Sequence, residues 1–479
     1  MSNVLVWFRN DLRIADNPAF HHACESARSN GHGVIATFLV AKEQWSRHDW
    51  GAMKSDFVLR NVAALARLLA ALNITLHVRQ APRFDDAPNV IGSLIDQFDI
   101  TDVYFNNELE INERNRDKHV TAAMTIRGVG VHVFDDQTVI PPGQVRTKSD
   151  GAYTVFTPFK KRWIEHVHAN PHFLRLLPLP PRQPDSNFIT NTTPAADKAT
   201  CSRTRPDLWP AGIEEAGMRL MTFVHSHIDS YDTDRDIPGI NGTSTLSPYL
   251  AAGVISVRQC LAVAIDGDIS RISVNEGGRE TWISELIWRE FYKHLLIGFP
   301  DLCKGHNFRR NFDSIPWRND ESEFKAWTTG RTGYPIVDAG MRQLNQTGWM
   351  HNRLRMITAM FLTKHLLIDW RWGERYFMQH LVDADYAANN GGWQWSASTG
   401  TDAQPYFRVF NPWTQSKRFD PQATYIKRFI PELKGLSPDI IHNPDKLAEC
   451  LFKTDYPNPI VDHKQARERA IQTFRAVNQ

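Results

Sequence analysis

The chain has 479 residues, of which 42% are hydrophobic and 23% charged, and its formal net charge is +2. This length predicts two or three domains with substantial cores, and the composition excludes wholesale disorder. The five cysteines include no C-x-x-C pair, the start of the chain lacks the features of a signal peptide, and no run approaches the ~20 apolar residues that cross a bilayer. We therefore expect a cytoplasmic protein with no membrane contact, no disulfide framework and no metal site.

The first part of the chain alternates short apolar runs with helical segments. The runs of strand length are Val4–Phe8, Val34–Val40, Leu76–Val78, Val103–Phe105 and Val131–Phe134. Helices are expected between Val58 and Leu72, over Asn89–Phe98 and over Asn112–Ile126. Such alternation predicts an α/β domain with a doubly wound parallel sheet, because right-handed crossovers favour parallel strands. No G-x-G-x-x-G follows the first strand and no P-loop occurs, so neither an NAD enzyme nor a P-loop ATPase is expected.

A proline-rich stretch separates this part from the rest. Between Pro171 and Pro210, prolines lie among Ser, Thr, Asn and Asp, which is typical of a long surface connection. Beyond it the chain reads as mostly helical. We therefore predict an α/β domain over 1–140, an interdomain linker over 141–210 and a large all-α domain over 211–479.

Two local biases stand out in the helical part. Ala339–Ile368 contains no acid but four cations, Arg342, Arg353, Arg355 and Lys364. This bias indicates either an anionic partner or an ordinary basic surface. Nine of the 15 tryptophans lie between Trp282 and Trp395, and such clustering suits packing, stacking on bases or flavin, or electron transfer.

The segment from Trp282 to Leu295 predicts a helix with two different faces. Its apolar face carries Ile283, Ile287, Phe291 and His294, and its opposite face carries Glu285, Trp288, Arg289 and Tyr292. Large aromatic residues beside charges are unusual on a solvated face. Either this helix is packed between core layers, or the second face lines a cavity.

Three further segments suit ligand contacts. Asn352 and Met356 are four residues apart, so they share one helical face, and the Asn amide offers the donor and acceptor that a base edge requires. The segment 381–396 combines Asp, Asn and Gly residues with two tryptophans, which is typical of a loop in close contact with a polar heterocycle. The segment 242–247, Gly-Thr-Ser-Thr-Leu-Ser, suits a phosphate, or simply a capped turn.

Five segments resemble the photolyase/cryptochrome family, and most closely its class I bacterial members that repair cyclobutane pyrimidine dimers. They are Val6-Trp-Phe-Arg-Asn-Asp-Leu-Arg13, Glu285-Leu-Ile-Trp-Arg-Glu-Phe-Tyr292, Thr332-Gly-Tyr-Pro-Ile-Val-Asp338, Gly348-Trp-Met-His-Asn-Arg-Leu-Arg355 and Asn389-Asn-Gly-Gly-Trp-Gln-Trp395. The resemblance spans essentially the whole chain. It implies a light-dependent DNA repair flavoenzyme, a carbon–carbon lyase that splits these dimers by electron transfer from photoexcited FADH⁻. Photolyases themselves take their target nucleotides out of the base stack.

The resemblance implies FAD inside the helical domain. The residues that would hold its phosphate region are Tyr231, Thr243, Ser244, Thr245 and Leu246. Asp383 and Asp385 would contact the ribose or the isoalloxazine, and Arg355 would pair with Asp383. Asn389 would face flavin N5. The electron path from the surface to the flavin would run through Trp317, Trp370 and Trp393.

The same resemblance implies the contacts to UV-damaged DNA. Trp288 and Trp395 would wall the flipped dimer, whose pyrimidine edges would contact Glu285, Asn352 and Met356. These three residues and Asn389 are the expected catalytic residues. The arginines that would hold the phosphates around the lesion are Arg235, Arg289, Arg353 and Arg408. We expect a bacterial monomer without an obligate protein partner, associated with the nucleoid through DNA.

A second chromophore is also implied. The residues that match a folate antenna are His48, Asn112, Glu113, Cys303 and Lys304. We therefore expect 5,10-methenyltetrahydrofolate in the interdomain cleft, so that 1–140 is the antenna-binding domain and 211–479 the FAD- and DNA-binding domain. Deazaflavin, which serves some relatives, is the alternative.

Two other functions remain open. A cryptochrome would be a blue-light photoreceptor without repair activity, and it usually has a C-terminal extension or another residue opposite flavin N5. A (6-4) photolyase would need a catalytic histidine where this chain has Asn352. His351 is one residue away, which turns its side chain by ~100° on a helix.

Overall fold

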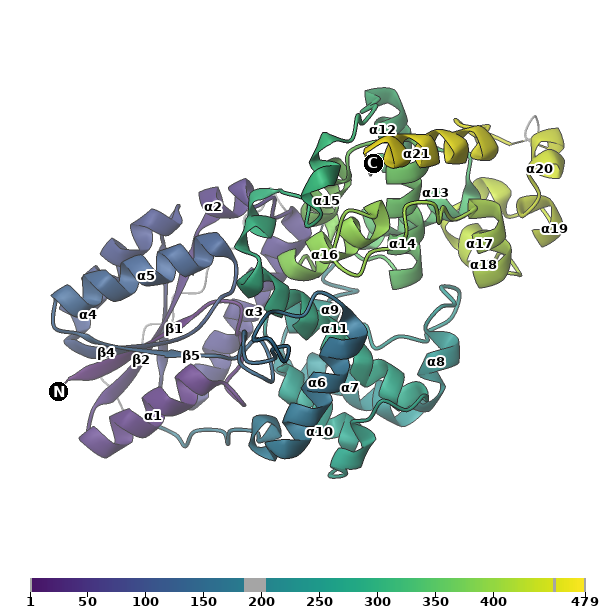
Figure 1. The fold of residues 1–479 in the computed structure, drawn as a ribbon. Coiled ribbons are helices and arrows are strands. Elements are labelled where there is room, and N and C mark those ends of the chain that lie inside the picture. Colours follow the sequence, from purple (N-terminus) through teal and green to yellow (C-terminus); the bar gives the residue numbers. More distant parts are fainter. Residues whose placement is uncertain (1, 185–203, 451–453, 478–479) are drawn as a thin grey trace. The chain divides into compact units, whose positions relative to one another are not determined.

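A computed structural model describes residues 2–184, 204–450 and 454–477 (Figure 1). Packing divides the chain into two compact units. We call the first, Met1–Ile228 with Ser244–Cys303, the sheet unit, and the second, Asp229–Thr243 with Lys304–Gln479, the helical unit. Part of the predicted linker, 185–203, lies outside the described residues.

The described residues of the sheet unit form a parallel sheet in the order β3-β2-β1-β4-β5. The strands are β1 (Asn3–Phe8), β2 (Gly33–Val40), β3 (Thr75–Gln80), β4 (Ile100–Asn106) and β5 (Gly130–Phe134). The helices are α1 (Pro18–Asn30), α2 (Lys42–Arg47), α3 (Ala52–Ala71), α4 (Ala87–Phe98), α5 (Ile111–Ile126), α6 (Phe156–Ala169), α7 (Ile213–Ser226), α9 (Ser247–Ala251), α10 (Val257–Ile265) and α11 (Gly278–Gly298). The predicted α/β fold with a doubly wound parallel sheet is confirmed.

Strand β1 is central and buried on both faces. Leu5 and Trp7 belong to a core cluster with residues of α4 and α5, which lie together on one side of the sheet in Figure 1. On the other face Phe8 packs against Phe20 of α1, with ring centroids 5.8 Å apart. Covering both faces explains why the strands read as continuous apolar runs rather than alternating ones.

Helix α1 is an element that the sequence analysis did not predict. Its inward face is built largely from Ala19, Ala23 and Ala27, which give a weak apolar signal. The available signals were at its ends. Asn17 caps the helix by accepting the N–H of Phe20, Pro18 follows at the first turn, and Gly31 ends it with a φ of 67°.

The helical unit contains α8 (Tyr231–Asp234), α12 (Glu321–Thr328), α13 (Pro335–Thr347), α14 (Asn352–Met360), α15 (Trp370–His380), α16 (Tyr386–Ala397), α17 (Pro412–Phe419), α18 (Thr424–Phe429), α19 (Pro438–Ile441), α20 (Pro444–Cys450) and α21 (His463–Val477). A π-helical turn, Phe361–His365, follows α14. One large core cluster includes Trp327, Trp370 and Trp393, so packing accounts for part of the tryptophan bias. In the described part of the chain, no helix has the length and apolarity needed to cross a membrane.

The two units do not follow the predicted boundaries at 140 and 210. Helix α11 belongs to the sheet unit, where Glu290 is 1% exposed. Its carboxylate accepts the backbone N–H groups of Val139 and Ile140, at 2.9 and 3.0 Å, and the indole N–H of Trp163, at 2.7 Å. These contacts join residues between 127 and 151 positions apart, so local composition gives no sign of them. The division into an antenna-binding domain over 1–140, a linker over 141–210 and an FAD- and DNA-binding domain over 211–479 therefore stays a prediction.

The motif Thr332–Asp338 has a structural role. Asp338 is fully buried and accepts the N–H groups of Thr332 and Gly333, at 2.8 and 3.0 Å, and the hydroxyl of Tyr456. The N–H of Ile460 donates to the Thr332 carbonyl at 3.0 Å. The motif thus fastens the segment around 454–461 to the start of α13.

Candidate functional site

Helix α11 presents the two faces that the sequence predicted. Ile283, Ile287 and Phe291 are buried, whereas Glu285 and Trp288 are half-buried. The other two members of the second face, Arg289 and Tyr292, are half-buried as well. The apolar face therefore packs into the sheet unit, whereas the second face is only half-buried.

The Trp288 ring is held in place by a residue that the sequence analysis missed. Phe156, at the start of α6, stacks on it with centroids 3.7 Å apart and planes 10° apart. One face of the indole is thus covered, so a base can stack only on the other. Lys160 lies near Glu285, and burial lowers the pKa of Lys160 while the carboxylates of Glu280 and Glu285 raise it.

Helix α14 carries Asn352 and Met356 as predicted. Asn352 is exposed and Met356 half-buried, while Leu354 on the opposite side is fully buried. His351 caps the helix, because its Nδ1 accepts the N–H of Arg353 at 3.2 Å. Burial lowers the pKa of His351 to about 4, so the cap is a neutral imidazole whose hydrogen is on Nε2.

The three arginines of the acid-free stretch pair with carboxylates elsewhere in the helical unit. Arg353 donates to both carboxylate oxygens of Asp236, at 2.6 and 3.2 Å, and Arg342 pairs with Glu432 at 2.9 Å. Lys364 is fully buried, and burial places its pKa well below the usual value. The stretch therefore does not by itself indicate an anionic partner. Of the other predicted phosphate contacts, Arg235 lies 4.0 Å from Asp236, and Arg289 donates to the Gln137 carbonyl at 2.6 Å.

Two of the predicted flavin contacts, Asp383 and Asn389, each have an oxygen without a hydrogen-bond partner among the described residues. Arg355 donates to Asp383 Oδ2 at 2.8 Å, which confirms the expected pair, but the buried Oδ1 of Asp383 is unpaired. The amide of Asn389 donates to the Glu374 carbonyl at 3.0 Å, and no contact in the described structure uses its Oδ1. Asp385 caps α16 by accepting the N–H of Ala388 at 3.0 Å.

These oxygens fit a flavin. The isoalloxazine and ribityl groups carry N–H and O–H donors, and a buried acceptor without a partner is costly unless a ligand supplies the donor. With one Nδ2 hydrogen donated to the Glu374 carbonyl, Asn389 keeps its Oδ1 and its second Nδ2 hydrogen for a ligand.

The predicted phosphate segment is divided between the units. Tyr231 and Thr243 belong to the helical unit, and Ser244, Thr245 and Leu246 to the sheet unit. Thr245 has a φ of 51°, and its hydroxyl accepts from Arg219 at 2.9 Å. Arg219 is thus a cation next to this segment that was not predicted from the sequence.

The three predicted electron-transfer tryptophans and the remaining DNA residues, Trp395 and Arg408, all belong to the helical unit. Trp393 and Trp370 are buried, and Trp317 is half-buried against the same core cluster. The Trp393 ring lies directly against Gly373, where a Cβ would overlap it. Gly373 is one helical turn after Trp370 in α15, and both tryptophans belong to the same core cluster.

Four of the five predicted antenna residues gather in the sheet unit. His48 Nε2 accepts from Asn112 at 3.0 Å, and His48 Nδ1 lies 3.3 Å from the Glu113 carboxylate. Cys303 lies beside the start of α5 at Ile111, and burial raises the pKa of its thiol to about 12. Lys304 belongs to the helical unit.

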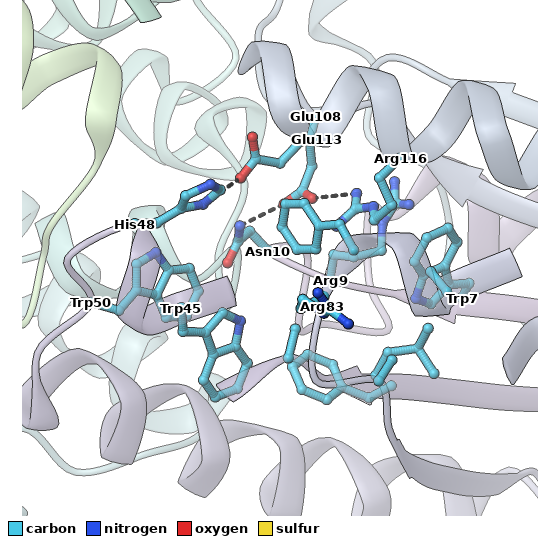
Figure 2. A pocket seen from close by; sticks show the side chains of 16 residues that line it. Trp7, Arg9, Asn10, Trp45, His48, Trp50, Arg83, Glu108, Glu113 and Arg116 are labelled. Carbon is cyan, nitrogen blue, oxygen red and sulfur yellow. Dashed lines mark hydrogen bonds and ion pairs between the residues drawn. The ribbon is translucent and has the colours of Figure 1, made fainter. Parts of the chain in front are cut away.

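Figure 2 shows a pocket of the sheet unit that His48 and Glu113 help to line. Its aromatic lining residues are Trp7, Phe38, Trp45, Trp50 and Phe84, and its charged ones, besides Glu113, are Arg9, Arg83, Glu108 and Arg116. Trp7 Nε1 and Arg9 Nε are buried donors without partners in the described structure. The pocket lies where β1 and β2 end, and the carboxyl edge of a parallel sheet is a usual place for ligands.

Phe156, Asp236 and most residues of this pocket were not predicted from the sequence as site residues. The rule for carboxyl edges of strands was a signal for Arg9, which directly follows β1. Phe156 and Asp236 gave no signal, because each acts through a partner more than a hundred residues away.

Comparisons with known proteins agree over the whole chain. A family model described as DNA photolyase matches residues 4–182, and one described as the FAD binding domain of DNA photolyase matches residues 282–476. Two proteins named deoxyribodipyrimidine photo-lyase are similar: that of Vibrio cholerae is 43% identical, covering 98% of this chain and 99% of its own, and that of Escherichia coli is 40% identical, covering 99% of each.

Solved structures give the same fold. A bacterial class III photolyase from Agrobacterium tumefaciens has a TM-score of 0.86 at 36% identity and covers 100% of this chain and 98% of its own. An archaeal photolyase from Sulfolobus tokodaii, solved with two FAD molecules, has a TM-score of 0.79 at 30% identity and covers 99% of this chain and 100% of its own. A Synechocystis cryptochrome has a TM-score of 0.84 at 28% identity and covers 99% of each chain.

Proposed function

Because this chain belongs to the DNA photolyase family and is an FAD-binding enzyme of that family, we propose that it splits cyclobutane pyrimidine dimers in UV-damaged DNA under blue or near-ultraviolet light. Bound FAD in its fully reduced form supplies the light-driven electron, which returns after the ring opens. The protein's own residues bind and orient the dimer, and they keep the flavin site closed to solvent.

The observation that carries this proposal is the second face of α11. Phe156 stacks on one face of the Trp288 indole, which leaves the other face for a base, and Glu285 lies about one turn earlier in α11. This pairs a stacking surface with a hydrogen-bonding carboxyl group, which suits a flipped pyrimidine dimer. On α14, Asn352 would supply an amide and Met356 an apolar contact.

The flavin contacts follow from the unpaired oxygens. Asp383 Oδ1 would accept a donor of the ring or the ribityl chain, with Arg355 holding the carboxylate in position. Asn389 Oδ1 would accept the N–H at flavin N5, which is present in the reduced cofactor.

Arg235, Arg353 and Arg408 would hold phosphates next to the lesion, together with Arg289 of the sheet unit. For Arg353 this means exchanging part of its bidentate pairing with Asp236 for a phosphate. Arginine suits both partners, because its planar fork matches carboxylate and phosphate alike.

We further propose that an antenna chromophore, 5,10-methenyltetrahydrofolate, binds at His48, Asn112, Glu113, Cys303 and Lys304. The aromatic pocket beside His48, with its unpaired Trp7 and Arg9 donors, fits a planar ring with carbonyl or anionic groups. Deazaflavin is the competing ligand. Reconstitution with each chromophore separately, read by bound absorbance and by energy transfer to FAD, decides between them. A His48→Ala variant that still binds the folate normally would contradict the assignment.

The test of function is a repair assay. Chemically reduced protein is mixed with an oligonucleotide carrying one thymine dimer, in blue light and in darkness. We expect repair only in light, and none of an oligonucleotide carrying a (6-4) photoproduct. Absence of dimer repair by FAD-replete, reduced protein would favour a photoreceptor, and repair of the second substrate would favour a (6-4) photolyase.

A further inference from the structure

The indole N–H of Trp370 has a specific hydrogen-bond acceptor. Trp370 Nε1 donates to Asn307 Oδ1 at 2.8 Å, and both residues are buried, with exposures of 0% and 1%. Asn307 is itself held by Asp313, whose Oδ1 accepts the Asn307 side-chain amide at 2.8 Å and its backbone N–H at 3.1 Å. The three side chains form a relay from a buried indole, through a neutral amide, to a partly exposed carboxylate.

Trp393 differs from Trp370 in this respect. Its Nε1 is buried without a partner among the described residues. A hydrogen bond at the indole nitrogen stabilises the positively charged form of the ring, and a carboxylate behind the amide strengthens that bond by polarising it. One-electron oxidation is therefore easier at Trp370 than at Trp393.

The other charges around Trp370 largely cancel. The Arg371 guanidinium lies 4.8 Å from the Trp370 ring centroid, but it pairs with Asp369 at 3.1 Å and with Asp313 at 3.4 Å. Asp313 is also close to Arg310, at 3.3 Å, and to His306, at 3.7 Å. The acceptor on the indole nitrogen is thus the contact that distinguishes Trp370.

Trp327 provides an internal comparison. Its centroid lies 6.0 Å from that of Trp393, and its N–H donates to the Thr358 carbonyl at 3.0 Å. Its acceptor is a backbone carbonyl with no carboxylate behind it in the described contacts. Of these two indoles, Trp370 therefore has the stronger acceptor.

We propose that Asn307, polarised by Asp313, is a positioning residue that directs electron transfer through Trp370 and keeps the indole proton in place. This deepens the proposed function and rests on its Trp393–Trp370–Trp317 path. Trp393, after giving one electron to the photoexcited oxidised flavin, takes one electron from Trp370. Trp370 then takes one from Trp317.

The choice of an amide over a carboxylate matters for the proton. An oxidised indole is a strong acid, and a carboxylate in contact with its N–H would remove the proton and trap the electron deficit there. A neutral amide accepts the hydrogen bond but is not a base at physiological pH. Oxidised Trp370 therefore keeps its proton and takes an electron from half-buried Trp317. Oxidised Trp317 then releases its proton to water, and an external reductant reduces it again.

The test is an exchange of the two side chains, Asn307→Asp with Asp313→Asn. The exchange keeps the total charge and the amide–carboxylate pair, but it places the carboxylate against Trp370. Asp313→Asn alone is the matched control, because it loses the same contacts to Arg371 and Arg310 without placing a base on the indole. Both are made with and without Trp317→Phe, in FAD-replete protein, and are followed by transient absorption of tryptophan radicals.

We expect the exchanged protein to form a deprotonated tryptophan radical even when Trp317 is replaced by Phe, whereas Trp317→Phe alone forms none. Asp313→Asn should lower the yield of electron transfer out of Trp370 without forming that radical. Identical radicals in the exchanged and control proteins would overturn the proposal. If Trp393→Phe in otherwise wild-type protein left photoreduction unchanged, the path itself would be refuted. That result is distinct from identical radicals in the exchanged and control proteins, which would overturn only the role of Asn307. Retained FAD absorbance and circular dichroism report folding of each variant.

Discussion

The side-chain amide of Asn389 is oriented by one hydrogen bond, and that bond decides what the amide can offer to a flavin. Nδ2 donates one hydrogen to the Glu374 carbonyl, and this bond orients the amide while leaving Oδ1 as an acceptor for a ligand. An acceptor without charge suits a reduced flavin, because it receives a proton-bearing nitrogen without adding a second negative charge beside an anionic ring.

We predict that Asn389→Asp lowers the reduction potential of bound FAD while FAD still binds. The shift should be tens of millivolts, since 30 mV corresponds to ~1.4 kcal/mol for a two-electron couple. Repair in air should fall because less flavin stays reduced. Spectroelectrochemical titration of both proteins is the measurement, and equal potentials with equal persistence of the reduced form in air would show that Asn389 does not face N5.

Trp288 is expected to contribute mainly to binding of the damaged site. Trp288→Ala should weaken binding of dimer-containing DNA by ~1–3 kcal/mol, the usual contribution of a base–aromatic stack. Phe156→Ala should cause a smaller loss, because it frees the indole ring without removing it. Undamaged duplex, which is bound through phosphates, is the control and should be nearly unaffected. An equal loss for both DNAs in folded, FAD-replete protein would contradict the stacking role.

At the scale of elements, much of the sheet unit was readable from the sequence. All five predicted strands exist, and the two faces of α11 are as expected, because burial leaves a periodic record in the sequence. Helix α1 was not predicted, because the alanines of its buried face give a weak apolar signal. The acid-free stretch left two interpretations open, and its ion pairs were not readable: Arg353 and Arg342 pair with Asp236 and Glu432, which no local pattern could associate with them.

The packing of α15 against α16 depends on one glycine. A Cβ at Gly373 would overlap the Trp393 ring, so Gly373→Ala should destabilise the protein by ~1–3 kcal/mol, as overpacked cores do. It should also slow photoreduction, since the indole must move. Gly217→Ala in α7 is the matched control, because its Cβ would meet no atom within 4 Å and should stabilise the helix by ~0.5–1 kcal/mol. Thermal unfolding of both variants checks this, and equal stabilities would contradict the close packing.

The whole molecule should lose stability in mild acid through its buried histidines. Burial lowers the pKa of His365 to about 3 and those of His351 and His77 to about 4. Unfolded, each takes up a proton near pH 6.5, whereas the folded protein keeps them neutral. Their contribution to stability is therefore complete above pH ~6.5 and decreases as the pH falls toward 4.

We predict that His365→Phe reduces this pH dependence. The ring keeps its stack on Phe361, at 4.9 Å, but can no longer be protonated. The slope of unfolding free energy against pH between 6.5 and 4.5 should decrease by up to ~1.4 kcal/mol per pH unit. Urea unfolding at several pH values measures it, with His172→Phe at an exposed position as control. An unchanged slope would mean that His365 is protonated in the folded protein.

The way the chain passes between the two units has a consequence during synthesis on the ribosome. Residues 244–303 complete the sheet unit, and 229–243 belong to a unit whose other residues begin at 304. The sheet can form early, but the backbone N–H groups of Val139 and Ile140 have their acceptor only after Glu290 has been synthesised. The Asp236 carboxylate likewise has its partner only after Arg353 has been synthesised. Domains that are contiguous in sequence fold one after another as they are made. Here the sheet unit can be completed only after residues 229–243 of the helical unit have been synthesised, so the two units cannot fold strictly in turn.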